Sequence, residues 1–310
     1  MKKINIVISL TIIFLIIYLV IVFFINKYKI KEYTYLYNYL DTYINITIYS
    51  RNDANKILKD IDEIYKEYDI LTSNKEVKNY KNLYYLNQNN EFDERLYDIL
   101  KIGLDYYKKS EGIININMGC VYDLYNDNII SLDDMKLCNT AIENIKLVNN
   151  NIEGEHNISL DNIKLSYVNN KIKNYLYENG YDSFIINSTG NVIVGKKNYD
   201  TSLFNVGIQY DNSANIIDVV SLNDKSIVSK GKYNGIKSIV SSKTNMVENN
   251  YKSVSVISND NMLSNFLANI LYFKSIEEGK KILKNYDAEA LWIDNQKNMY
   301  YTDGYLKYRI

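Results

Sequence analysis

The feature that most constrains this chain is an uncharged apolar run near its N-terminus, in which only three polar residues interrupt the sequence from Ile4 to Ile25. A helix of about 20 apolar residues crosses the hydrocarbon core of a bilayer, whereas a buried core helix is rarely apolar on every face for such a length. A cleavable signal peptide would end in small residues, which do not follow this run. We therefore expect residues 1–29 to form a cytoplasmic tip and a retained transmembrane signal-anchor.

The side of the membrane on which the remaining residues lie is less directly encoded. Lys2 and Lys3 precede the apolar run and three lysines follow it by residue 31, so the flanking charges favour neither orientation. Short N-terminal flanks usually stay cytoplasmic, and we expect residues 30–310 to form one domain outside the cytoplasm. The chain has 36 basic and 37 acidic residues, a balance that gives no indication of nucleic-acid binding.

Cysteine and histidine, which often carry metal binding and nucleophilic catalysis, are scarce in this chain. Cys120 and Cys138 either form one disulfide or remain two buried thiols, and their spacing does not decide between these alternatives. We favour two thiols. The only histidine, His156, lies in a Gly-Glu-His turn without a second His or a Cys nearby, so we expect a solvated loop residue with no role as ligand or base.

The pattern of apolar residues along the chain predicts an α+β domain with segregated helices and meandering antiparallel strands. Asp53 is placed to cap the first helix, and Gly180 to end the fourth. We expect helices at residues 52–71, 92–107, 132–144, 164–179, 262–273 and 276–286. We expect strands at residues 42–49, 145–148, 157–160, 183–187, 191–194, 204–209, 216–222, 226–229, 253–258, 288–293 and 299–302.

Six short segments occur in an order that is similar to one enzyme family. The most specific is SEGIININMG at residues 110–119, and SKGKY at residues 229–233 aligns with a T-S-G-D-Y pattern. The others are LYYLN at 83–87, INSTGNVIVG at 186–195, IVSSKTN at 239–245 and SNFLANIL at 264–271. Together they resemble the ApbE-type flavin transferases, the FAD:protein FMN transferases of bacterial envelopes, from about residue 39 to residue 293. An unrelated anchored domain with chance matches is the alternative.

The resemblance implies a fold, a reaction and a set of binding positions. The fold would be a single ApbE/T-fold-like domain. The reaction would cleave the pyrophosphate of FAD, pass FMN to a Thr or Ser of an envelope protein and release AMP, with Mg²⁺ and basic groups neutralising charge. The positions that would contact the cofactor are Asn117, Gly119, Ser188, Thr189, Gly190, Lys230, Tyr233 and Ser238, and those of the metal ligands are Asn265 and Asn269.

The chain departs from the family pattern where the family has charged or metal-binding groups. Asn265 and Asn269 replace the Asp and Thr that ligate Mg²⁺, and two neutral amides would hold this hard cation weakly. Ser238, Ser241 and Ser242 replace a His, an Asp and a Pro in a second segment. The metal site and the charged machinery of the family are therefore not reproduced by the residues of this chain.

The same departure occurs in the helix start at residues 161–170, where the family has Lys, Gly, Tyr and Asp. Leu165, Ser166 and Asn170 replace the Lys, Gly and Asp, and only Tyr167 is kept, although a shift of one residue would place Lys164 at the Lys position. The chain has no Pro and 12 Gly, so a lost Pro or Gly reflects its composition. Lys and Asp are abundant, and their loss needs another explanation.

We therefore expect a catalytically degenerate family member that binds flavin or docks an envelope partner, with no catalytic residue assigned. FAD is the expected cofactor, and Mg²⁺ is expected to bind weakly at best. The alternative is an active Mg²⁺-dependent FAD:protein FMN transferase that uses substitute ligands, for which Asp161, Asp224 and Asp260 are the candidates.

Overall fold

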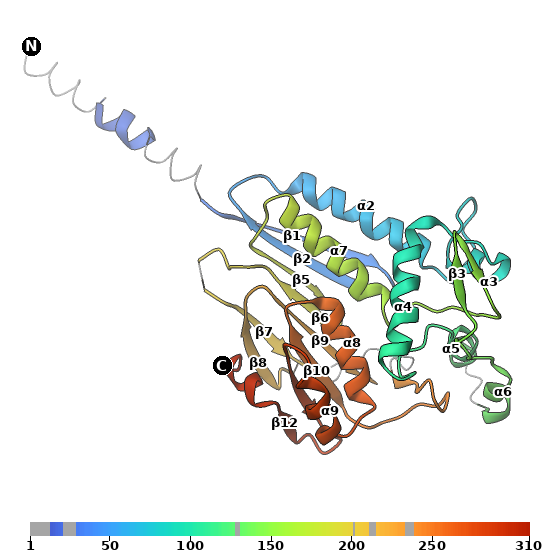
Figure 1. Cartoon of the computed structure of the whole chain (residues 1–310). Coiled ribbons are helices and arrows are strands. Elements are labelled where there is room, and N and C mark those ends of the chain that lie inside the picture. The colour runs from blue at the N-terminus through green and yellow to red at the C-terminus, as the bar shows by residue number, and fades with distance from the viewer. Residues whose placement is uncertain (1–12, 21–28, 128–130, 201, 211–214, 233–238) are drawn as a thin grey trace, which may run out of the picture.

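An eight-stranded antiparallel sheet organises the part of the chain that follows the apolar run (Figure 1). The computed structural model describes residues 13–20, 29–127, 131–200, 202–210, 215–232 and 239–310. The strands lie side by side in the order β1 (Lys31–Tyr39), β2 (Thr42–Ser50), β5 (Phe184–Ser188), β6 (Asn191–Val194), β9 (Lys225–Gly231), β10 (Ser253–Ser258), β11 (Ala288–Ile293) and β12 (Met299–Tyr301). Each neighbouring pair is antiparallel.

Helices cover one face of this sheet. They are α2 (Asn55–Leu71), α7 (Lys164–Glu178), α8 (Asn261–Tyr272) and the shorter α9 (Ile276–Leu283). The strands meet them with alternating apolar residues, as in β2, where Ile44, Ile46 and Ile48 are fully buried. Burial of this face is the main apolar contribution to the stability of the domain.

The opposite face of the sheet is covered by a hairpin and a short C-terminal helix. The hairpin consists of β7 (Phe204–Ile208) and β8 (Asp218–Leu222), and the helix is the 3₁₀ segment η4 (Asp303–Lys307). Phe204, Val220 and Tyr305 from these elements pack in one cluster with Ile227 of β9 and Leu291 of β11. Because both faces are covered at the centre of the sheet, every residue of β10 is buried.

The remaining elements pack at one end of the sheet (Figure 1). They are α3 (Leu83–Asn89), η1 (Glu94–Leu96), α4 (Tyr97–Lys109), α5 (Gly119–Asn126), α6 (Leu132–Leu137), β3 (Lys146–Val148) and β4 (Asn151–Glu153). Cys120 in α5 and Cys138 after α6 form a disulfide, with their Cα atoms 5.6 Å apart. Our expectation of two thiols was therefore wrong, because the α5–α6 packing brings the two side chains within bridging range.

Most sequence-based elements are confirmed, including the α+β class, α7 and β10. The strand expected at residues 157–160 is wrong, since the second strand of this small hairpin is β4, and the Asn-rich segment before it forms the turn. The elements that were missed include β1, α3, α5 and η4. Expectation and structure also differ for β7 and β8, which form a separate sheet instead of continuing the meander.

The predicted transmembrane segment is described only in part. Residues 13–20 are helical, and no helix among the described residues is long and apolar enough to cross a membrane. The rest of the apolar run lies in residues 1–12 and 21–28, outside the described residues.

Loss of the disulfide should destabilise the domain without changing its fold. The bridge closes a loop of 18 residues, and a loop of this length corresponds to about 3 kcal/mol of stabilisation. We expect the full chain in detergent to lose about this unfolding free energy in denaturant titrations when a reducing agent is added. A Cys120→Ser, Cys138→Ser double variant should be equally weakened and should not respond to the reducing agent. Equal stability of the wild type with and without reductant would contradict the prediction.

Candidate functional site

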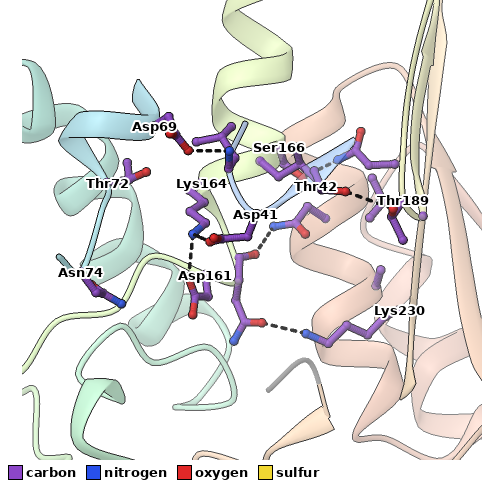
Figure 2. A pocket seen from close by; sticks show the side chains of 18 of the residues that line it. Asp41, Thr42, Asp69, Thr72, Asn74, Asp161, Lys164, Ser166, Thr189 and Lys230 are labelled. Atoms are coloured by element: carbon purple, nitrogen blue, oxygen red, sulfur yellow. Dashed lines mark hydrogen bonds and ion pairs between the residues drawn. The ribbon is translucent and has the colours of Figure 1, made fainter. Parts of the chain in front are cut away.

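A cavity of about 1010 Å³ opens between the helices and the end of the sheet (Figure 2). It is enclosed by the β1–β2 turn, the β5–β6 turn, strand β9, the start of α7 and the side of α8 that carries Asn265 and Ala268. Its polar lining includes Asp41, Thr42, Asp69, Asp161, Asn162, Lys164, Ser166, Thr189, Ser229, Lys230 and Asn265. A second cavity of about 300 Å³ lies beside it, towards β7, and Gly190 and Ser229 line both.

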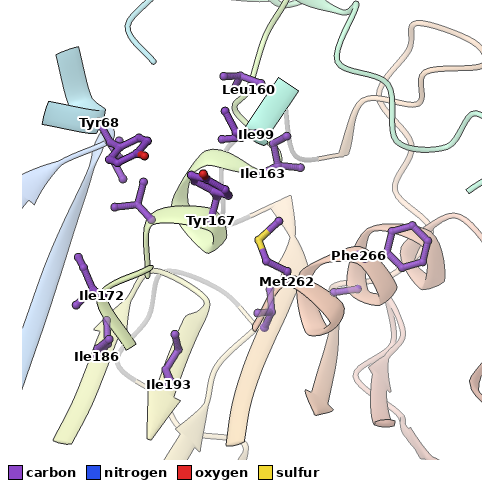
Figure 3. Close-up of a cluster of buried hydrophobic side chains, with 14 of the residues drawn as sticks. Tyr68, Ile99, Leu160, Ile163, Tyr167, Ile172, Ile186, Ile193, Met262 and Phe266 are labelled. Carbon is purple, nitrogen blue, oxygen red and sulfur yellow. The ribbon is translucent and has the colours of Figure 1, made fainter. Parts of the chain in front are cut away.

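The apolar core beneath the cavity holds the two helices in place (Figure 3). Tyr167 and Ile172 of α7, Met262 of α8, and Ile186 and Ile193 of the sheet belong to one buried cluster. The start of α7 brings Lys164 and Ser166 to the cavity, and α8 brings Asn265, so packing of the core determines where these polar groups lie.

The β1–β2 turn reaches over the start of α7. Leu40 and Asp41 have positive φ angles of 55° and 61°, which suit a tight two-residue hairpin turn. The backbone N–H of Leu40 donates to Oδ1 of Asp69 at 2.7 Å, which ties the turn to α2. On the other side of the turn, the hydroxyls of Thr42 and Thr189 lie 3.0 Å apart and join it to the β5–β6 turn.

Lys164 is a buried cation with two carboxylate partners. Its Nζ lies 2.7 Å from Oδ2 of Asp41 and 2.9 Å from Oδ1 of Asp161, and 8% of the residue is exposed. Burial lowers the pKa of Lys164, but the charges of Asp161 and Asp41 outweigh burial and raise the pKa above its ordinary value. Lys164 is therefore charged and neutralised within the protein.

Lys230 is also buried, with 6% of the residue exposed, but its partners are neutral. Its Nζ donates to Oδ1 of Asn162 at 3.0 Å and to Oδ1 of Asn269 at 2.5 Å. Among the described residues no carboxylate pairs with this ammonium, and burial lowers the pKa of Lys230 to about 7 from its ordinary value of 10.5. The two lysines thus reach the same loop with different electrostatic environments (Figure 2).

Of the residues predicted to contact a cofactor, Thr189, Gly190 and Lys230 line the cavity. Gly190 has a φ of 69° in the β5–β6 turn, a conformation that other residues rarely adopt, and its carbonyl accepts from the N–H of Ser229. Ser188 lies beneath the cavity, where its hydroxyl bonds the carbonyl of Asn191. Tyr233 and Ser238 fall outside the described residues.

Asn117 and Gly119, which were also predicted to contact the cofactor, do not line the cavity. Asn117 is 1% exposed, and its amide donates to the carbonyl of Ala141 and accepts from the N–H of Asn157. A Cβ at Gly119 would lie 2.2 Å from Oδ1 of Asn157. Both residues pack the segment at the start of α5 against the segment at Asn157, and the structure thus gives them a packing role.

The three carboxylates considered as substitute metal ligands do not lie together in the fold. Asp161 lines the cavity but is paired with Lys164. Asp260 caps α8 through the N–H of Leu263, and Asp224 accepts from the hydroxyl of Tyr177. Neither Asp224 nor Asp260 lines the cavity.

Two further residues from the family motifs have structural contacts. The Ser242 hydroxyl donates to the carbonyl of Gly112 at 2.5 Å, which ties two motif segments together. The backbone N–H of Ser241 donates to the carbonyl of Met246.

The sequence model of the ApbE family matches residues 40–292 of the chain. The chain belongs to the ApbE family. Its fold is similar to that of the flavin transferase ApbE from Vibrio cholerae, with a TM-score of 0.78, 17% identity, and coverage of 90% of this chain and 100% of the other. No curated protein matches the sequence.

Two further solved structures of the family have the same fold. The ApbE protein from Thermotoga maritima has a TM-score of 0.81 at 15% identity, covering 90% of this chain and 100% of the other. The flavinyl transferase ApbE from Pseudomonas stutzeri, in its apo form, has a TM-score of 0.76 at 12% identity, covering 91% of this chain and 99% of the other. At such identities the similarity concerns the fold.

The residues at the family's metal position do not fit Mg²⁺. The Oδ1 atom of Asn269 accepts from the Lys230 ammonium, and the amide of Asn265 donates to the carbonyl of Asn162. A metal ion at this place would lie against a positive charge with only neutral ligands. In the described part of the chain, no three His, Cys, Asp or Glu side chains gather as a metal site would require.

FAD fits the cavity better than the metal does. Ligand cavities usually measure about 300–1,000 Å³, so this one has room for a dinucleotide. Lys230, Thr189 and the glycine turn at Gly190 would offer a cation, a hydroxyl and an accessible backbone to its phosphates.

Sequence reasoning missed several residues of the polar lining, among them Asp41, Asp69 and Asn162. Asp41 lies 123 residues from Lys164 along the chain, so no local pattern connects them. The ion pair between Asp161 and Lys164 could have been predicted from the sequence, because oppositely charged residues three positions apart meet at a helix start.

The buried charge of Lys230 should make stability depend on pH in a characteristic way. The unfolded chain binds a proton at this lysine up to about pH 10.5 and the folded chain up to about pH 7, so this residue's contribution to stability rises as pH increases across this window. We expect Lys230→Met to raise the unfolding free energy at pH 6 by on the order of a few kcal/mol, because the buried charge is removed. The difference should shrink towards pH 10.5. Denaturant titrations of both chains at several pH values measure it, and a difference that does not vary with pH would contradict the assignment.

Proposed function

We propose that this chain is a membrane-tethered member of the ApbE family that binds a flavin nucleotide in its cavity and has lost the transfer of FMN. Family membership and fold support the flavin ligand, and the cavity offers space and polar groups for it. The loss of transfer is proposed because the charged groups needed to neutralise a reacting pyrophosphate are reduced to lysines, without a metal-binding carboxylate.

The hydrogen bond from Lys230 to Asn269 is the observation that carries this proposal. In an active metal-dependent site, oxygen ligands at this position would be free to bind the cation. Here the amide oxygen of Asn269 is already engaged by an ammonium, and Asn265 is engaged through its amide. A cation bound here would have to displace a buried lysine.

The alternative of an active transferase with substitute ligands has less support. It needs carboxylates near Asn265 and Asn269, and of the three candidates only Asp161 lines the cavity. Asp161 is held by Lys164 at 2.9 Å, so recruiting it to a metal would leave a buried lysine without this partner.

We further propose that residues 1–29 form the anchor and residues 30–310 a domain outside the cytoplasm, where an envelope protein is the expected partner. The apolar run supports the anchor by its length. The disulfide between Cys120 and Cys138 supports the location, because disulfides persist in oxidising compartments.

The flavin proposal predicts binding without turnover. FAD titrated into the full chain in detergent should show saturable quenching of flavin fluorescence. Prolonged incubation with FAD, Mg²⁺ and a Thr-containing acceptor protein should release no AMP and attach no flavin, because the metal site is missing. The Vibrio cholerae flavin transferase serves as the positive control. AMP release or covalent flavin at rates near this control would refute the loss of transfer, and absence of quenching would refute flavin binding.

The anchor proposal predicts the behaviour of the chain in cell fractions. In a bacterial host the full chain should remain in membranes after high-salt and carbonate washes, and protease added to spheroplasts should digest the domain. A chain that lacks residues 1–29 should leave the membrane fraction, because the apolar run is removed. Protection of the full-length domain in intact spheroplasts would reverse the proposed orientation.

A further inference from the structure

We propose that Lys230, with Asn162 and Asn269, forms a phosphate-binding site that needs no divalent cation, in which the lysine ammonium takes the place of the metal. The identification of the natural ligand as a nucleotide that contains a diphosphate rests on the proposed flavin binding. The site itself is defined by the side chains and can be tested with inorganic pyrophosphate.

The first support is a cation without a counter-ion. In the described part of the chain, Lys230 has no carboxylate partner, although only 6% of it is exposed. Burying a charge without a partner of opposite sign is costly. Such a residue is stabilised when an anion binds beside it, and the cavity on which Lys230 lies is open to ligands.

The second support is the hydrogen-bonding capacity of the ammonium. A lysine ammonium has three N–H donors, and two of them are directed to Oδ1 of Asn162 and Oδ1 of Asn269. The two amides fix the position of Nζ without neutralising it. One donor of the ammonium remains for a ligand oxygen, and a charge-assisted bond to phosphate is the strong form of this interaction.

The surroundings of Lys230 point to the same ligand. Of the carboxylates in the cavity lining, Asp41 and Asp161 are paired with Lys164, and Asp69 accepts from the backbone N–H of Leu40. Helix α7, which is 15 residues long, begins at the cavity, and its N-cap residue Ile163 provides no side-chain hydrogen bond. The positive end of a helix adds to the attraction for an anion.

Lys164 does not provide an equivalent site. It is as deeply buried as Lys230, but Asp41 and Asp161 neutralise it. A phosphate beside Lys164 would meet these two carboxylates. The difference between the two lysines therefore assigns the phosphate to Lys230.

Isothermal titration of pyrophosphate into the full chain, in detergent with EDTA, tests the site. We expect binding in EDTA and little change in the dissociation constant when Mg²⁺ replaces EDTA. Lys230→Met should weaken binding by about tenfold or more, the effect of losing one charge-assisted bond to phosphate. Lys173→Met is the matched control, because Lys173 is buried to a similar extent on α7 but does not line the cavity, and its binding should equal that of the wild type.

A second variant separates charge from packing. Asn269→Asp keeps the shape of the side chain and gives Lys230 a carboxylate partner, which should compete with phosphate and weaken binding in EDTA. The folded state of each variant is checked by its thermal transition. Lys230→Met is expected to be more stable than the wild type at neutral pH, so its loss of binding would not reflect unfolding.

The outcomes distinguish this inference from the proposed function. Binding of pyrophosphate that requires Mg²⁺, equal binding by Lys230→Met, or no binding by the wild type would overturn the metal-independent site. If pyrophosphate binds through Lys230 but the fluorescence of FAD is not quenched by the chain, the phosphate site is supported and the flavin proposal fails. If FAD binds equally to the wild type and Lys230→Met, the flavin proposal holds and this inference fails.

Discussion

The burial of the central strands on both faces determines where polar groups lie in this molecule. Helix α8 covers β9 and β10 on one side, and the β7–β8 hairpin and η4 cover the sheet on the other. Polar side chains that must meet a ligand are therefore confined to the ends of the strands and to the flanking turns. The cavity lies at such an end, where Lys230 near the end of β9 faces the polar side of α8.

The two buried lysines of the cavity differ in how their charges are compensated. Lys164 is compensated by Asp41 and Asp161, an arrangement that links the β1–β2 turn to α7 and supports the architecture. Lys230 is fixed in position by two amides but not compensated. A buried charge that lowers the stability of the free protein and attracts a ligand is a known form of the conflict between stability and function.

The sequence allowed prediction of the elements whose patterns are local. Helices α7 and α8 followed from helical periodicity and β10 from β-branched residues. Strand β1 was missed although its tyrosines alternate with other residues and share one face, because most of this edge strand is exposed. In the candidate site, Thr189, Gly190, Lys230 and Asn265 came from motif segments. The contact from Lys164 to Asp41 could not be predicted, since it depends on the packing of a turn 123 residues away.

Two departures from the family pattern, at positions 230 and 269, are in direct contact in the structure. Read separately, Asn269 replaces a metal ligand and Lys230 occupies the Ser position of the T-S-G-D-Y pattern. In the fold these residues share a hydrogen bond of 2.5 Å. A chain with Lys at 230 and Asp at 269 would place a carboxylate beside the ammonium and compensate its charge, and one with Ser at 230 and Asn at 269 would have no cation in this place. The residues present keep an ammonium next to Asn269, one of the two positions that align with the family's metal ligands, and this contact is the basis of the proposed metal-independent phosphate site.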